Sequence, residues 1–328
     1  MIARWMLTGL LSLSLTSCIG QQVAESYVQI SPVQIHRFDK ALYQLITSTD
    51  TALEAELVRE YPQMLDILGK GVLNLRSLDT EGFFSKLRAY YGEPTLNKLY
   101  QDALHYYEDI DEIEEKLSAA FTFLRNELPD FPIPAIYMHV SGLNQNVLVG
   151  DSLLSLSIDK YLGAGYPLYQ DYFYAPQRIR MTSQHVVPDY LIGWLMAEFP
   201  FEGNERVLLD RMVYEGKLRY VVCRALNQPL SAPMLFIPEV EHWCETHEAE
   251  MWRQIIERKQ LYTPDQLTTD SYFDEMISPF SRSDAPGNVG VWIGFRIVKR
   301  YMEESGVSLR EMLTTDAQTI LTAAKYRP

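Results

Sequence analysis

Cysteine is scarce in this chain of 328 residues, positive charge is in deficit, and fixed-period repeats and low-complexity tracts are absent. The formal net charge of −14 repels the phosphates of nucleic acid, which we therefore exclude as a partner. No apolar run after residue 17 approaches the ~20 residues that a transmembrane helix needs. Hydrophobic residues still make up 47% of the chain, as in globular proteins, so the composition predicts a folded body with a sizeable core.

The sequence motifs of common enzymes are also missing. There is no G-x-S-x-G nucleophile elbow, no P-loop and no G-x-G-x-x-G turn after a strand. The pair His247-Glu248 begins like the zinc-protease motif HExxH, but Met251 stands where the second histidine belongs. On a helix His242 lies about 140° from His247, so the two imidazoles cannot share one metal ion. We therefore expect a protein without catalytic activity, cofactor or bound metal.

The N-terminus carries an export signal. Arg4 precedes an apolar run from Trp5 to Leu15, and Leu-Thr-Ser-Cys over residues 15–18 matches the bacterial lipobox. In such a signal the thiol of Cys18 receives diacylglycerol and becomes the mature N-terminus. The sequence thus predicts a signal peptide over 1–17, a lipidated tether over 18–31 and attachment to the bilayer through acylated Cys18. The protein is expected on the periplasmic face of the outer or inner membrane, with surface exposure left open.

Two cysteines, Cys223 and Cys244, remain after lipidation. An exported compartment permits a disulfide between them. Both lie in helical patterns and not in a cysteine-dense, loop-rich segment, which favours two buried thiols.

The residue pattern predicts an α+β fold that is predominantly helical, with a small central antiparallel sheet. Strand patterns cover 33–38, 133–140 and 146–158, and Asp39 is the expected N-cap of a first helix. We expect one body over 32–328, with a possible subdivision near 130 into a helical part and a part with the sheet and further helices. The remaining helices are predicted over 52–107 with breaks at Pro62, Gly71, 77–79 and 92–94, and over 109–124, 188–199, 203–226, 238–258, 288–304 and 315–325.

The helix predicted over 203–226 is apolar nearly all round. A helical wheel places Asp210, Lys217 and Arg224 on a narrow polar strip, and directs Glu215 and Arg219 into the interior as an i, i+4 pair. A buried carboxylate needs a partner, either a cation or a metal ion. Because a guanidinium lies one turn away, we predict a buried ion pair of Glu215 with Arg219, with metal binding by Glu215 as the alternative.

The preceding helix offers a second candidate site. Asp189 follows the helix-starting Pro188 and is expected to pair with Arg178 or Arg180 near the helix N-terminus. His185, Asp189 and Glu215 form a weak candidate for a metal-binding trio.

Two glycines four residues apart, Gly290 and Gly294, lie in the helix predicted over 288–304. Small residues at this spacing allow helices to approach closely, so we expect a packing role for both.

Several segments together resemble the gliding motility lipoprotein GldB family of Bacteroidota. The resemblance covers almost all of the mature chain, in the same segment order. The matching segments are IHRFDKALY (35–43), YMHVSGLNQNVLVGDSLLSLSIDKYLG (137–163), YPLY (166–169), VPDYLIGWL (187–195), LLDRMVYEGKLRYV (208–221) and PGNVGVWIGFRIVKRYM (286–302).

This family in turn looks like a relative of predicted zinc-dependent proteases, in which a strand pair precedes an HExxH helix and a later helix carries a Glu-Gly pair. Here Glu215-Gly216 occupies the place of the later pair, while the histidines and the general base are missing. The resemblance implies a zincin-like arrangement without a catalytic site. It also implies an accessory or scaffold role in an envelope machine, in gliding or associated secretion, with other envelope proteins as partners. The alternatives are a divergent metallohydrolase and, because the chain has 21 Tyr and 5 Trp, a glycan- or solute-binding lipoprotein.

Overall fold

The computed structural model describes residues 28–75, 77–228, 238–280, 282 and 284–328. The predicted signal peptide, Cys18 and most of the tether lie outside these residues. Within them, no helix combines the length and apolar character needed to cross a membrane. The fold is predominantly helical with a small sheet, as the sequence predicts.

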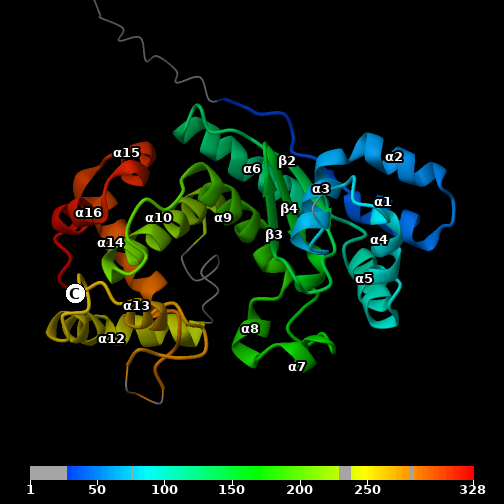
Figure 1. The fold of residues 1–328 in the computed structure, drawn as a ribbon. Coiled ribbons are helices and arrows are strands. Elements are labelled where there is room, and N and C mark those ends of the chain that lie inside the picture. The colour runs from blue at the N-terminus through cyan, green and yellow to red at the C-terminus, as the bar shows by residue number, and fades with distance from the viewer. Residues whose placement is uncertain (1–27, 76, 229–237, 281, 283) are drawn as a thin grey trace, which may run out of the picture.

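A four-stranded mixed sheet lies at the centre of the molecule (Figure 1). The strands follow the order β1-β2-β4-β3, and only β3 and β4 pair antiparallel, whereas β1–β2 and β2–β4 are parallel. The predicted antiparallel sheet is therefore wrong for two of the three pairings. The reason is that β4, which is buried at all five positions, lies between β2 and β3. Strand β2 therefore pairs with β4 and not with β3, the next strand in the chain. The strands are β1 (Ile35–His36), β2 (Ala135–His139), β3 (Val147–Gly150) and β4 (Leu153–Ser157).

The N-terminal helices begin and end close to the predicted breaks. Pro62 and Pro94 each occupy the first turn of a new helix, where a missing N–H costs nothing. Asp39 is a buried first-turn residue and not the N-cap, because the first helix begins at Phe38. The helices are α1 (Phe38–Thr47), α2 (Ala52–Glu60), α3 (Pro62–Gly71), α4 (Phe83–Tyr91), α5 (Pro94–Tyr106) and α6 (Asp111–Glu127).

The C-terminal half contains the predicted long helices and short ones that the pattern did not reveal. Helix α9 packs on the sheet, where a Cβ atom on Gly193 would lie 3.0 Å from Val147. The missed elements are α7 (Tyr169–Tyr172), α8 (Ala175–Ile179), α13 (Gln266–Ser271), α15 (Leu309–Thr314) and two 3-10 turns, η1 (Ile158–Lys160) and η2 (Ser183–His185). The long helices are α9 (Val186–Glu198), α10 (Leu208–Leu226), α12 (Pro238–Glu257), α14 (Val289–Ser305) and α16 (Ala317–Ala324).

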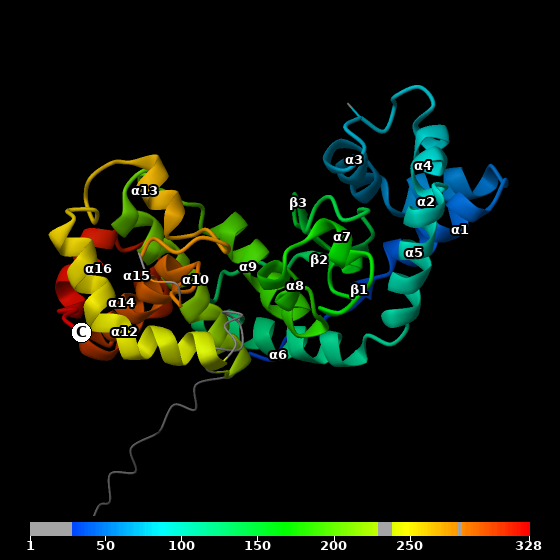
Figure 2. The same ribbon diagram turned by 90° about the horizontal axis from the view of Figure 1, so that it is seen from below.

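Seen from below, helices α1–α5 lie on one side of the sheet, and α10, α12 and α14–α16 lie on the other (Figure 2). Helices α6 and α9 connect the two sides, since α6 contacts both α9 and α10 while α9 contacts β3 and β4. The N-terminal segment follows α6. Val28 exchanges two hydrogen bonds with the Asn126 side chain at 2.8 and 2.9 Å, Val33 N–H donates to Ser118 Oγ, and Ile35 N–H donates to Glu114 Oε1.

Helices α10 and α14 cross with their backbones in contact. A Cβ atom on Gly294 would lie 1.7 Å from the carbonyl oxygen of Met212, and one on Gly216 would lie 2.3 Å from the carbonyl of Gly294. A Cβ atom on Gly290 would lie 2.9 Å from the Phe273 ring. The predicted close packing at Gly290 and Gly294 is therefore confirmed. Cys223 and Cys244 are buried free thiols, so the favoured prediction for the cysteines is also confirmed.

Candidate functional site

Glu215 and Arg219 lie together on α10. Arg219 Nη1 is 3.0 Å from Glu215 Oε2, and the two side chains are 12% and 23% exposed, respectively. Neither of these two atoms makes a hydrogen bond of good geometry to any described residue. The attraction is therefore electrostatic, and Glu215 is less buried than the helical wheel predicts. The wheel gives direction around the axis, but it does not reveal how completely neighbouring elements cover each face.

Lys217 belongs to the predicted polar strip of α10, but another part of the protein covers it. Its side chain is buried, with 9% exposure, and Nζ donates hydrogen bonds to the carbonyl oxygens of Leu313 at 2.9 Å and Thr315 at 2.5 Å. The link between α15 and α16 covers this side of α10, which no local pattern in α10 could reveal. Lys217 thus joins two segments that are about a hundred residues apart in the chain.

The predicted pairing of Asp189 with Arg178 or Arg180 is not formed in the part of the chain that the structure describes. Asp189 Oδ2 instead accepts a hydrogen bond from the Tyr161 hydroxyl at 2.6 Å, while Arg180 pairs with Glu275. The sequence could not anticipate this because Glu275 reaches α8 from a distant segment.

The candidate metal trio is likewise not assembled. His185 Nδ1 lies 3.0 Å from Thr182 Oγ1, Asp189 bonds to Tyr161, and Glu215 faces Arg219. Among the described residues, no three His, Cys, Asp or Glu side chains are grouped as metal ligands would be. Burial lowers the pKa of His185, so the neutral imidazole is favoured.

A buried polar network at the end of β2 and β4 was missed by sequence reasoning. Asp159 has no exposed surface, and it accepts hydrogen bonds from the backbone N–H groups of Ser141 at 3.0 Å and Leu143 at 2.7 Å and from the Ser157 hydroxyl. Burial raises the pKa of Asp159, and these donors oppose the increase. The network fixes the turn after β2, so it has a structural role. The only sequence signal was the run Ser-Leu-Ser-Ile-Asp at the end of a strand.

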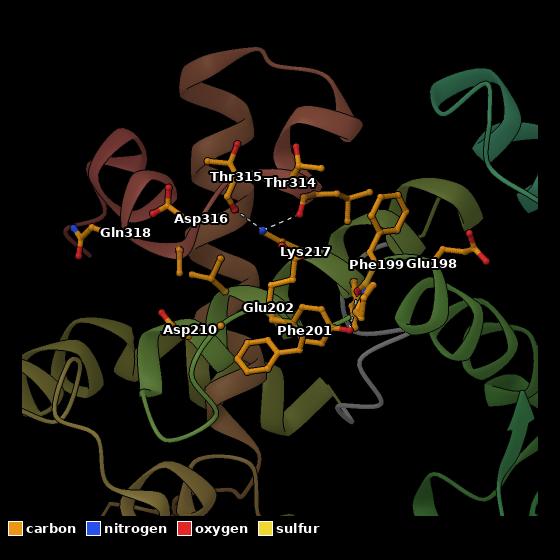
Figure 3. A pocket seen from close by; sticks show the side chains of 17 residues that line it. Glu198, Phe199, Phe201, Glu202, Asp210, Lys217, Thr314, Thr315, Asp316 and Gln318 are labelled. Atoms are coloured by element: carbon orange, nitrogen blue, oxygen red, sulfur yellow. Dashed lines mark hydrogen bonds between the residues drawn. The ribbon is translucent and has the colours of Figure 1, made fainter.

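The clearest candidate site is a cavity of about 630 Å³ above Lys217, which we call the Lys217 cleft (Figure 3). This volume falls within the range of pockets that hold small ligands. Three segments form its walls: the loop after α9 (residues 198–203), one face of α10 (Asp210, Val213, Tyr214, Lys217 and Leu218), and the α15–α16 link (residues 313–318).

Aromatic side chains form one wall of the Lys217 cleft. The rings of Phe201 and Tyr214 lie 5.1 Å apart, and the Tyr214 hydroxyl donates a 3.0 Å hydrogen bond to the carbonyl oxygen of Phe199. This bond holds the loop after α9 against α10. The aromatic wall is therefore fixed by contacts within the protein.

The charge of the cleft is negative. Its lining contains four carboxylates and a single cation. Burial lowers the pKa of the Lys217 ammonium to about 8, although Asp316 and Glu202 oppose the decrease. Burial also raises the pKa of Glu198. The cleft has the features of a binding site, because its cation is already bonded to backbone carbonyls and its carboxylates surround an accessible space.

The fold and site define a helical protein built around a small mixed sheet, with a preformed acidic cleft and no assembled metal-ligand set among the described residues. The family model described as gliding motility protein GldB matches residues 20–328, so the chain belongs to the GldB family of gliding motility proteins. No curated protein and no solved structure matches it.

Proposed function

We propose that this protein is a lipid-anchored, non-catalytic accessory component of the envelope machinery that drives gliding or the secretion associated with it. The family match supports the connection to gliding, and the lipobox at residues 15–18 supports the anchor. In this proposal the protein acts by holding partner proteins at the membrane.

One observation carries the non-catalytic part of the proposal. Three side chains were the candidates for the metal ligands of a metallohydrolase, and each contacts a different partner within the protein. These pairs are His185 with Thr182, Asp189 with Tyr161, and Glu215 with Arg219. Zinc hydrolysis needs three ligands around one ion and a base for the water. A carboxylate 3.0 Å from a guanidinium is neutralised without a metal ion.

We also propose that the body derives from a protease-like scaffold. The order of a strand pair, helix α9 and helix α10 with Glu215-Gly216 matches the order expected from the protease relatives. Gly216 now serves the crossing with α14, where a side chain has no room. A scaffold kept for packing explains why a Glu-Gly pair persists without the histidines.

The experiment uses a gliding strain that carries this gene. Deletion should abolish colony spreading, and the genes for the wild type, His185→Gln and Glu215→Gln should each restore it, because neither side chain takes part in chemistry. The full chain, purified in detergent, incubated with zinc and desalted, should retain far less than one zinc per chain. The metallohydrolase alternative would instead be established by two results together. The wild type would retain one zinc per chain that Glu215→Gln does not retain, and Glu215→Gln would fail to restore gliding.

A further inference from the structure

Neither the family match nor the internal packing explains the acidic lining of the Lys217 cleft. Its one cation, Lys217, is turned inward to Leu313 and Thr315 (Figure 3). An acidic ligand would meet carboxylates and not a free ammonium. The cleft therefore favours a positively charged occupant.

Three carboxylates around the opening remain available to such an occupant. Glu202 and Asp316 are exposed, and Asp210 is half-buried. Asp210 is fixed by a 2.9 Å hydrogen bond from the Asn204 N–H, and Asp316 caps α16 by accepting from both the N–H and the hydroxyl of Thr319. These bonds orient two of the carboxylates while leaving their negative charge in place, which reduces the entropy lost when a cation binds.

The aromatic wall suits the rest of a basic side chain. Arginine and lysine have long apolar stems that pack on aromatic surfaces while the charged end reaches a carboxylate. In the Lys217 cleft, Phe201 and Tyr214 provide such a surface beside Glu202 and Asp210. A small inorganic cation would contact the carboxylates but not the aromatic wall, whereas a basic peptide segment can contact both.

We propose that the Lys217 cleft binds a basic segment of a partner protein, with an arginine or lysine side chain placed among Glu202, Asp210 and Asp316 and its stem on Phe201 and Tyr214. This inference rests on the proposed function as an accessory that holds partner proteins. It adds the place of contact and the chemistry of the partner.

The test begins with a phage library of random 12-residue peptides selected on the full chain in detergent. Selected peptides should be enriched in arginine and lysine. The affinity of the best peptide is then measured by fluorescence anisotropy against a triple variant, Glu202→Gln, Asp210→Asn and Asp316→Asn. The amides keep side-chain size, and Asn remains a good N-cap, so thermal melting should show a folded protein.

The matched control is a second triple variant, Glu56→Gln, Glu81→Gln and Glu115→Gln, at exposed positions in α2, in the turn before α4 and in α6, far along the chain from the cleft. Both triple variants change the net charge by the same amount. The cleft variant should bind the peptide at least tenfold more weakly than the wild type, and the control less than threefold.

Equal losses in both variants would overturn the inference, because the binding would then reflect overall charge. Selection of no peptide, or of acidic or neutral peptides, would also overturn it, as would full displacement of the peptide by a neutral oligosaccharide. These outcomes leave the proposed function intact if deletion of the gene still abolishes gliding and the zinc content stays low.

Discussion

Replacing Gly294 by alanine should destabilise the protein at the crossing of α10 and α14. The new Cβ atom would lie 1.7 Å from the carbonyl oxygen of Met212 and 2.4 Å from its carbonyl carbon. Both atoms belong to the backbone of α10, so no side-chain rotation relieves the overlap. The two helices must separate by roughly 1.7 Å, because the Cβ atom would lie 1.7 Å from the oxygen and ordinary contacts begin at 3.4 Å.

The expected cost follows from two opposing effects. Overpacking of a core costs about 1–3 kcal/mol, and contact between two backbones belongs at the upper end of that range. Alanine recovers about 1 kcal/mol relative to glycine within a helix. The net destabilisation is therefore about 2 kcal/mol. The shift in Tm per kcal/mol is about 2–4 °C at 150–250 residues and decreases with size, so Tm should fall by roughly 3–6 °C in this chain.

Thermal and urea unfolding of the full chain, followed by circular dichroism, measure this change. Gly165→Ala is the matched control, since a Cβ atom there meets no atom within 4 Å and the residue has no positive φ. The control should leave the Tm within about 2 °C of the wild type, since surface changes rarely exceed ±0.5 kcal/mol. A Gly294→Ala variant as stable as Gly165→Ala would show that the helices do not cross as described.

Three further predictions test other parts of the molecule. The pKa of Lys217 is lowered from 10.5 to about 8, so between these pH values the unfolded chain binds more protons than the folded protein. The free energy of unfolding of the wild type, relative to that of Lys217→Met, should therefore rise from pH 7.5 to 9.5 in urea titrations. A constant difference would contradict the burial of the ammonium. Asp159→Asn should lower the free energy of unfolding by about 2 kcal/mol, because an amide cannot accept every hydrogen bond that the carboxylate accepts. The control is Asp151→Asn at an exposed position, and equal urea midpoints for the two variants would contradict the network. Cys18→Ser should move the protein from the membrane to the soluble fraction after cell lysis, and unchanged membrane association would rule out the acyl anchor.

Local sequence signals predicted most of the helices and few of the long-range contacts. Pro62 and Pro94 marked helix starts correctly, because proline acts through its own backbone and needs no distant partner. Helices α7 and α8 were missed since four or five residues are too short to establish a periodicity. The antiparallel pairing was wrong for β1–β2 and β2–β4, because alternation identifies a strand but not its neighbours.

The candidate site was harder to predict than the fold. Glu215 and Arg219 were recognisable because both partners lie on one helix, one turn apart. The burial of Lys217 on the predicted polar strip was not recognisable, because its acceptors, Leu313 and Thr315, are nearly a hundred residues further along the chain. The cleft itself combines three separate segments, and a one-dimensional pattern contains no information about how they meet.

The hydrogen bonds between the N-terminal segment and α6 have a mechanical consequence. Their acceptors, Glu114, Ser118 and Asn126, repeat at multiples of four residues and so follow one i±4 ridge, which is inclined to the helix axis. Tension applied to the N-terminal segment along this ridge loads the three attachment points in shear, all at the same time, and passes into a helix braced by α9 and α10. A protein fastened in this way can bear traction on its N-terminus without peeling its edge strand β1 from the sheet.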